Sequence, residues 1–210
     1  MASQAAYYEV DAQFYEAGDA AYSAETRRRL VDELSPHGDI LELACGTGHW
    51  TAELVRHAES ITAVDASPTA LEINRARVGD GRVRYVTADL FAWEPDRRYE
   101  TVFFGFWLSH VPPARFDAFW DMVGSCVATT GTVMFVDEDD RSTLDTVESR
   151  FLREGTPCVR RLLRDGSTHD IVKVFWSVQE LHDRLRDLGW EMNVRPLHDM
   201  FLVGSGRRTG

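Results

Sequence analysis

Five apolar runs of strand length alternate with helix-like segments along the first two thirds of the chain. The runs span residues 39–44, 60–66, 82–89, 101–107 and 131–138. Strands that are this apolar on both faces are typical of a parallel sheet covered by helices on both sides. The alternation predicts helices between successive strands and an α/β, Rossmann-like fold whose ligand lies beyond the carboxyl ends of the strands.

The last third of the chain departs from this alternation. Its expected elements are a charged helix at 142–154, a β-hairpin at 159–175 turning at Asp165-Gly166, a helix through Leu188 begun by a capping box of Ser177 and Glu180, and two strands near 190–197 and 200–205. The two final strands are close enough to pair antiparallel. The whole predicts a seven-stranded, mostly parallel sheet with an antiparallel last strand.

The length of 210 residues predicts one domain. Its expected parts are an N-terminal helical lid at 1–36, a cofactor-binding core at 37–140, a helix and hairpin insertion for the substrate at 141–176, and the end of the core at 177–206. A helix over residues 3–17 and a second over 24–35 would build the lid.

The net charge of −11 argues against partners with a phosphate backbone and against an anionic membrane surface. A small acceptor molecule is the expected partner. The three cysteines are sparse, odd in number and without metal-ligand spacing, so we expect reduced thiols, a cytoplasmic protein and no metal site. We also expect no signal peptide and no transmembrane helix. The oligomeric state stays open.

The stretch LELACGTGHW, residues 41–50, is a glycine-containing loop between the first strand and the next helix. Gly46 and Gly48 carry no Cβ, so a ligand can approach their backbone closely. Asp65 ends the second strand, where it can accept hydrogen bonds from ribose hydroxyls. A glycine turn alone can be purely structural, but this turn followed by an acid in a βαβ unit indicates a nucleoside ligand.

Two nucleoside classes compete for the loop. A dinucleotide fold prefers a third glycine, and Thr51 stands at that position. S-adenosylmethionine has no pyrophosphate to cradle, and Glu42 could serve its amino-acid end directly or by orienting the loop. Asp89 ends the third strand, where it could accept from the adenine amino group, with Leu90 and Phe91 against the ring. Three acids at three successive strand ends favour S-adenosylmethionine.

With LELACGTGHW as the glycine loop, AVDAS as the ribose acid and TADLF as the adenine segment, the chain resembles class I S-adenosylmethionine-dependent methyltransferases. The resemblance implies S-adenosyl-L-methionine as cofactor and S-adenosyl-L-homocysteine as product. His49-Trp50 departs from the many members that carry a further glycine there, and Trp50 could pack against the methionine portion. The expected cofactor contacts are Tyr8, Glu42, Ala44, Gly46, Gly48, Trp50, Asp65, Ala66, Asp89, Leu90 and Phe91.

The methyl acceptor is expected beyond the fourth strand, in FFGFWLSHVPP, where His110 is the titratable residue. His110 could take a proton from a hydroxyl, donate to an anionic oxygen, or be a structural residue. The hairpin adds cations, and its register decides their faces. A two-residue turn places Arg160 on the face of Lys173, whereas a three-residue turn places Arg161 there. The sequence leaves both registers open, and solvated edge-strand cations are the plain alternative.

Over nearly the whole chain, including VFFGFWLSHVP, FVDEDD and VRRLLRDG, the sequence is similar to phosphonate O-methyltransferases of natural-product, antibiotic biosynthesis. The resemblance implies an anion pocket of Tyr22, His110, Arg161 and Lys173, with His110 and Tyr22 in catalytic positions. Asp170 departs from the basic residue expected there, and could pair with Arg161. The resulting expectation is O-methylation of a small anionic acceptor, an ionised oxygen that needs no general base.

Three alternatives remain at this point. One is O- or N-methylation of another small molecule, with a carboxylate, hydroxyl or amine as acceptor. Another is a nicotinamide-dependent oxidoreductase, which Thr51 at the third-glycine position disfavours. The last is a cofactor-binding protein without catalysis. The identity of the acceptor and the pathway are not encoded in any motif of the chain.

Overall fold

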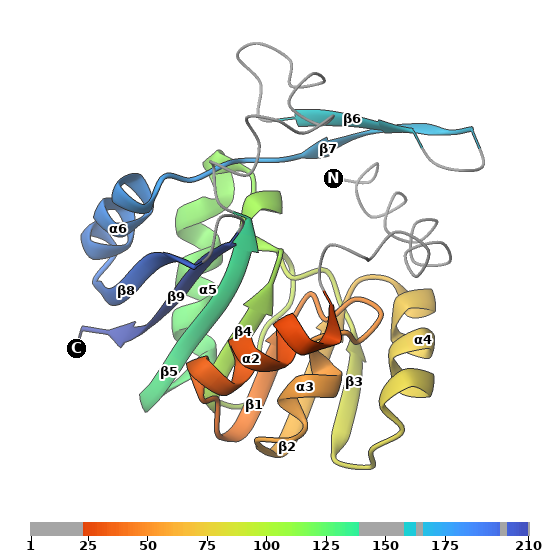
Figure 1. The fold of residues 1–210 in the computed structure, drawn as a ribbon. Coiled ribbons are helices and arrows are strands. Elements are labelled where there is room, and N and C mark those ends of the chain that lie inside the picture. The colour runs from red at the N-terminus through yellow and green to blue at the C-terminus, as the bar shows by residue number, and fades with distance from the viewer. Residues whose placement is uncertain (1–22, 139–157, 163–165, 198–200, 210) are drawn as a thin grey trace.

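The computed structural model describes residues 23–138, 158–162, 166–197 and 201–209 (Figure 1). The expected helices at 3–17 and 142–154, together with Tyr8 and Tyr22, lie outside the described residues, as do the side chains of Arg161 and Leu162.

A seven-stranded sheet forms the centre of the molecule, in the order β3-β2-β1-β4-β5-β9-β8. Its strands are β1 (Gly38–Leu43), β2 (Ala58–Asp65), β3 (Val83–Thr87), β4 (Tyr99–Gly105), β5 (Val127–Glu138), β8 (Trp190–Leu197) and β9 (Phe201–Arg208). Six strands run in one direction, and β9 runs antiparallel to them, between β5 and β8. The predicted mostly parallel sheet with an antiparallel final strand is confirmed.

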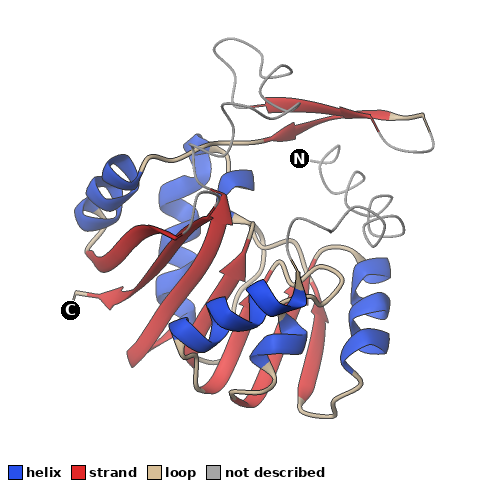
Figure 2. Ribbon diagram, viewed as in Figure 1, coloured by secondary structure: helices blue, strands red, loops and turns tan. Residues whose placement is uncertain are grey.

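Helices cover both faces of the sheet (Figure 2). They are α2 (Ala24–Leu34), α3 (Thr51–Leu54), α4 (Pro68–Val78), α5 (Phe116–Cys126) and α6 (Val178–Asp187), with two 3-10 turns, η3 (Leu108–His110) and η4 (Pro113–Arg115). Two start signals in the sequence act as expected. The Ser67 hydroxyl accepts from the Ala70 N–H at 3.0 Å ahead of Pro68, and Ser177 forms a capping box with Glu180.

Two apolar clusters hold these layers together. On one face, residues of α5 and α6 such as Trp120 and Leu185 pack against the strands. On the other face, α2, α3 and α4 contribute residues such as Val31 and Leu54. Because the strands are buried on both sides, they read as continuous apolar runs in the sequence.

The connection between β3 and β4 contains turns and no helix, although the alternation predicted one; residues 88–98 are all described. Pro95 lies within this connection, lacks a backbone N–H and disfavours a helical conformation in the residue before it. The segment therefore runs as an irregular loop. That part of the prediction was wrong.

A separate two-stranded hairpin, β6 (Cys158–Leu162) and β7 (Thr168–Val172), stands over the carboxyl ends of the parallel strands (Figure 1). Its register pairs Arg160 with Asp170 and Arg161 with His169. This is the register of a three-residue turn, so position 161 falls on the face of Val159 and Ile171, which are both buried. The alternative left open by the sequence is thereby decided.

Candidate active site

The loop after β1 takes a left-handed backbone at several positions. The φ angles are 53° at Ala44, 52° at Gly46 and 89° at Gly48. A Cβ added to Gly48 would lie 2.5 Å from the Asn74 side chain, so only glycine fits there. A Cβ added to Gly46 would meet no atom within 4 Å, which leaves open space beside its backbone. The loop therefore offers open backbone at Gly46, whereas Gly48 is buried against Asn74, and ligand contact at both glycines stays a prediction.

The Asp65 carboxylate is fixed by two backbone donors at the end of β2. One oxygen accepts from the Gly46 N–H at 2.8 Å, and the other accepts from the Ser67 N–H at 2.9 Å. These two bonds orient the carboxylate beside the loop, where we expect it to meet the hydroxyls of a ligand. The ends of β1 and β2 are thus joined at the place predicted for the ribose.

Glu42 is buried beneath the same loop, with 1% of its surface exposed. Burial, opposed by a hydrogen bond from the Thr51 hydroxyl and aided by the nearby charge of Asp65, raises the pKa of its carboxyl to about 8. Its Oε2 atom has no hydrogen-bond partner among the described residues. A buried polar atom without a partner beneath a ligand loop fits a binding role.

Asn74 of α4 ties the loop together, a role that the sequence did not reveal. Its Nδ2 atom donates to the Thr51 hydroxyl at 2.9 Å and to the Gly46 carbonyl oxygen at 3.3 Å. Its Oδ1 atom accepts from the Tyr85 hydroxyl at 3.1 Å. Because an asparagine inside a helix has no local pattern, only the fold brings it under the glycines.

The predicted adenine segment follows β3. The exposed Asp89 accepts from the Phe91 N–H at 3.0 Å, which shapes the turn, and Leu90 is buried. The Phe91 ring lies 5.9 Å from the Trp107 ring and 4.5 Å from the Arg115 guanidinium. Ala66, the other predicted contact nearby, is exposed.

Trp50 packs into the protein core. Its ring lies 5.5 Å from Phe103 and 5.9 Å from Phe106, and it is 7% exposed. A Cβ added to Gly105 would approach the Trp50 indole nitrogen to 2.4 Å, so the indole fills the space left by that glycine. The structure thus explains why a large residue is tolerated after the loop. Contact between Trp50 and the cofactor stays a prediction.

The other half of the site lies where β4, β5 and the hairpin meet. Lys173 is 2% exposed, and its ammonium donates to Glu138 Oε2 at 2.9 Å and to the Ser109 hydroxyl at 3.2 Å. The Val174 N–H donates to the Ser109 carbonyl oxygen at 2.8 Å. The chain leaving the hairpin is therefore attached to η3 by both backbone and side chain.

Asp137 lies beneath this cluster and is 2% exposed. Its carboxylate accepts from the N–H groups of Ser109 at 2.9 Å and Glu138 at 2.8 Å. Burial raises the pKa of Asp137, while the Lys173 charge opposes the rise. Two acidic side chains thus surround one lysine.

His110 is 7% exposed, and its Nδ1 atom lies 2.7 Å from the Val172 carbonyl oxygen. Lys173 directly follows Val172, so His110 and Lys173, the two predicted acceptor residues, belong to one junction between η3 and the hairpin.

The Arg160 guanidinium pairs with Asp170 through bonds of 2.7 and 2.8 Å. The suggested pairing of Asp170 with Arg161 is corrected, because the register places Asp170 opposite Arg160.

The sequence reasoning missed Ser109, Asp137 and Glu138. The sequence did contain a signal for the two acids, because FVDE places them at the carboxyl end of the fifth strand. Glu42, Asp65 and Asp89 have corresponding places at the carboxyl ends of the first three strands. Among the described residues, no group of three or more His, Cys, Asp or Glu could hold a metal ion, and no helix is long and apolar enough to cross a membrane.

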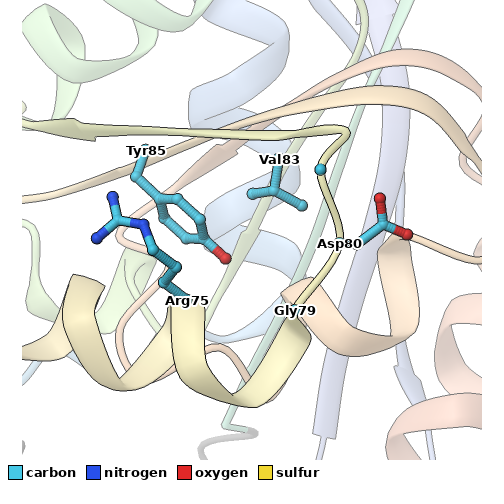
Figure 3. Close-up of a pocket in the computed structure, with 6 residues that line it drawn as sticks. Arg75, Gly79, Asp80, Val83 and Tyr85 are labelled. Carbon is cyan, nitrogen blue, oxygen red and sulfur yellow. The ribbon is translucent and has the colours of Figure 1, made fainter.

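A shallow cavity of about 310 Å³ lies apart from these groups, beside the turn that leads into β3 (Figure 3). The Arg75 guanidinium lies 4.7 Å from the centre of the Tyr85 ring there. The lining residues are Arg75, Gly79, Asp80, Gly81, Val83 and Tyr85. None of the predicted site residues is among them.

Comparison with known proteins identifies the class of enzyme. A model of the methyltransferase domain family matches residues 40–131. The structure of the DhpI complex with SAH is 39% identical, with a TM-score of 0.86 over 99% of this chain and 96% of that one. The DhpI complex with SAM and HEP is 41% identical, with a TM-score of 0.87 over 98% and 96%. The chain belongs to the class I S-adenosylmethionine-dependent methyltransferases.

A curated relative matches over a shorter stretch. Trans-aconitate 2-methyltransferase of Enterobacter sp. (strain 638) is 34% identical over 93 residues, which cover 43% of this chain and 35% of that protein. The matched stretch therefore spans about a third of the relative's length.

The methyltransferase uses S-adenosylmethionine, and its own residues fit that cofactor. Open space beside the Gly46 backbone, the oriented carboxylate of Asp65 and the unpartnered Oε2 atom of Glu42 lie together at the ends of β1 and β2. The Gly46 backbone and Asp65 would hold the nucleoside, and Glu42 would hold the cationic amino-acid portion. The nicotinamide alternative is overturned by this family membership.

Proposed function

We propose that this methyltransferase esterifies an oxygen of a small anionic acceptor, a phosphonate in particular. The main support is the junction of His110 and Lys173, a histidine and a buried cation brought together at the carboxyl ends of β4 and β5. The similarity to DhpI over 99% of the chain points to the same acceptor class. Arg161, at a position on the inward face of the hairpin, and Tyr22 complete the proposed anion pocket.

S-adenosylmethionine, when bound, supplies a methyl group on a positively charged sulfur that an oxygen nucleophile can attack. The protein's task is then to present that oxygen and to exclude water. Lys173 would attract the other oxygens of the acceptor, and His110 would donate a hydrogen bond that selects the oxygen to be methylated. A phosphonate oxygen is ionised at neutral pH, so no residue has to remove a proton.

The cations of this pocket would act mainly in binding. A charge about 4 Å from the attacking oxygen contributes roughly 4 kcal/mol at an effective dielectric of 20. That attraction is stronger for the charged acceptor than for the transition state, in which the charge is partly neutralised. We therefore expect Lys173 to lower KM for the acceptor more than it raises kcat.

A carboxylate is the second candidate acceptor. The supporting observation is the 34% identity to a trans-aconitate methyltransferase over 93 residues. The same ammonium and imidazole could hold a carboxylate, which is planar and carries a single negative charge.

The deciding experiment is an acceptor panel of matched pairs, each a phosphonate and the carboxylate of the same carbon skeleton. Methyl transfer is read by mass spectrometry of the product and of S-adenosylhomocysteine. We expect esters of the phosphonates, formed with a higher kcat/KM than those of the carboxylates. Turnover of carboxylates or neutral alcohols without any phosphonate ester would refute the proposal.

A further inference from the structure

A chain of hydrogen bonds leads from the edge of the sheet to Glu42. The Tyr85 hydroxyl, on edge strand β3, donates to Asn74 Oδ1 at 3.1 Å, and Asn74 Nδ2 donates to the Thr51 hydroxyl at 2.9 Å. The Thr51 hydroxyl in turn donates to the Glu42 carboxyl. Tyr85, at the outer end, lines the shallow cavity of Figure 3, whereas Asn74 and Thr51 are completely buried. The chain therefore connects β3, α4, α3 and β1.

The direction of each bond in this chain is fixed. Asn74 Nδ2 also donates to the Gly46 carbonyl oxygen at 3.3 Å, and a carbonyl oxygen only accepts, so the amide has one orientation. The Thr51 hydroxyl accepts from that amide and keeps its own proton for Glu42. Because neither side chain has exposed surface, bulk water does not compete for these bonds. Glu42 is therefore the acceptor at the end of a chain of donors.

Glu42 lies in surroundings that favour its neutral form. It is 1% exposed, and the charge that acts on it among the described residues is that of Asp65, another acid. A buried carboxyl without a neutralising cation keeps its proton to a higher pH than an exposed one. Cys45 and Tyr85 lie near it, but burial raises the pKa of the Cys45 thiol well above 9.0 and that of Tyr85 to about 12. Both therefore stay neutral at the pH values at which Glu42 titrates.

We propose that cofactor binding expels the proton of Glu42, and that Thr51 and Asn74 are positioning residues that lower the cost of this ionisation. One Glu42 oxygen accepts from Thr51, so the proton of the neutral form lies on the unpartnered Oε2 atom. That O–H bond breaks, the proton passes to the solvent, and the cofactor's ammonium group pairs with the carboxylate. The inference rests on the assignment of Glu42 to the amino-acid portion of the cofactor, and it does not depend on which acceptor is methylated.

The Thr51 hydroxyl acts on this equilibrium because a hydrogen bond to a charged group is stronger than one to a neutral group. It therefore stabilises the ionised Glu42 more than the protonated form, and Asn74 holds it in the donating orientation. Affinity for the cofactor should rise with pH until Glu42 is ionised in the free protein, and should then level off. Loss of the hydroxyl should move that limit to a higher pH.

The first test counts protons in the wild-type protein. Calorimetry of S-adenosylhomocysteine binding at about pH 6.5, in two buffers of different ionisation enthalpy, gives the number of protons released. We expect about one proton per S-adenosylhomocysteine and close to none for 5′-methylthioadenosine, which has the same nucleoside without the amino-acid portion. No release with S-adenosylhomocysteine, or equal release with both ligands, would overturn the inference without the need for any variant.

The second test is Thr51→Val, which removes the hydroxyl and keeps the shape of the side chain. We expect S-adenosylhomocysteine to bind about tenfold more weakly at about pH 6.5, and less than about twofold more weakly at about pH 9.5, where Glu42 is ionised in both proteins. The ligand's own amino group titrates equally with both proteins and cancels in the comparison. Binding of 5′-methylthioadenosine should not change at either pH.

Thr51→Ser restores the donor and should bind S-adenosylhomocysteine as the wild-type protein does. Thr62→Val, at a buried threonine of β2 outside the chain, is the matched control and should leave the pH dependence unchanged. A loss of affinity in Thr51→Val that is equal at both pH values would show that Thr51 only shapes the loop, and would refute its positioning role. Should Thr51→Val not fold, Thr51→Ala gives the same comparison, and an equal loss there would refute the role as well.

Discussion

The Nδ1 atom of His110 donates a hydrogen bond to the carbonyl oxygen of Val172 at 2.7 Å, which joins the end of η3 to the end of β7. A carbonyl oxygen only accepts, so Nδ1 carries the proton of this bond. In the neutral ring Nε2 is then an acceptor, and in the protonated ring it is a second donor. The same geometry is therefore compatible with a base for a neutral hydroxyl and with a donor to an anionic oxygen.

His110→Asn distinguishes these two roles. For an acceptor that is already ionised, we expect KM to rise several-fold and kcat to fall by about tenfold or less, because only a positioning bond is lost. Steady-state kinetics with separate kcat and KM values provide the measurement, and thermal unfolding checks the junction. Abolished turnover with intact acceptor affinity would instead identify His110 as a general base.

Lys173→Ala removes the cation of the proposed anion pocket. We expect KM for an anionic acceptor to rise by about 30-fold or more, as is typical when one partner of a buried charge pair is truncated. The affinity for S-adenosylhomocysteine should change little. Arg160→Ala is the matched control, since it removes a hairpin cation that is bound to Asp170 on the other face. Equal kinetics in the two variants would exclude Lys173 from acceptor binding.

Asp65→Ala tests the cofactor site. The carboxylate orients Gly46 and is expected to bind the ribose, so its removal should weaken S-adenosylhomocysteine binding by about 10- to 100-fold, the usual effect of losing charge-assisted hydrogen bonds. Isothermal calorimetry measures the change. Asp39→Ala, at the opposite end of the parallel strands, should leave the affinity near that of the wild-type protein. Normal affinity in Asp65→Ala would defeat the assignment.

Glu42 predicts a pH dependence of stability. Its pKa is raised from 4.5 in the unfolded chain to about 8 in the folded protein, so the folded state holds this proton more tightly. The resulting stability is fully present below pH 4.5 and is lost as the pH rises toward 8. The loss amounts to about 1.4 kcal/mol per pH unit at most within this window.

Glu42→Gln removes this proton equilibrium. Urea unfolding at about pH 5.5 and about pH 7.5 should therefore show the variant gaining stability relative to the wild-type protein at the higher pH. Subtraction of the two proteins cancels other groups that titrate equally in both, Asp137 included. A difference in unfolding free energy that does not vary with pH would show that the Glu42 carboxyl is ionised in the folded state.

The parallel strands and the acids at their ends could be predicted because each is a local pattern. Asp65 follows a buried strand, and the carboxyl ends of parallel strands share one edge, so its place was legible from the sequence. The hairpin register could not be predicted from the sequence. A shift of one residue exchanges the faces on which Arg160 and Arg161 lie and preserves the alternation of the strands. The prediction of a helix between β3 and β4 was wrong for a different reason. The spacing of the strands does not specify the conformation of the segment that connects them.

The contacts of Lys173 lie beyond such patterns. Ser109 is 64 residues away in the sequence, and Val172 and His110 are 62 residues apart. Each residue is unremarkable in its own segment, and the cluster exists only because the hairpin folds back over η3. The sequence likewise showed Glu138 as an acid at a strand end, but it did not reveal that Glu138 pairs with Lys173.

The reversed direction of β9 has a consequence for the acceptor end of the site. A parallel strand would begin at the far edge of the sheet, whereas β9 begins at the active edge, where Phe201 is paired with Glu138 and its ring lies 6.1 Å from Phe106. The first residue of the final strand therefore lies beside the proposed acceptor pocket. Substitutions at the start of β9 would alter the surroundings of Glu138, whereas Asp65 and the glycine loop at the ends of β1 and β2 would keep theirs.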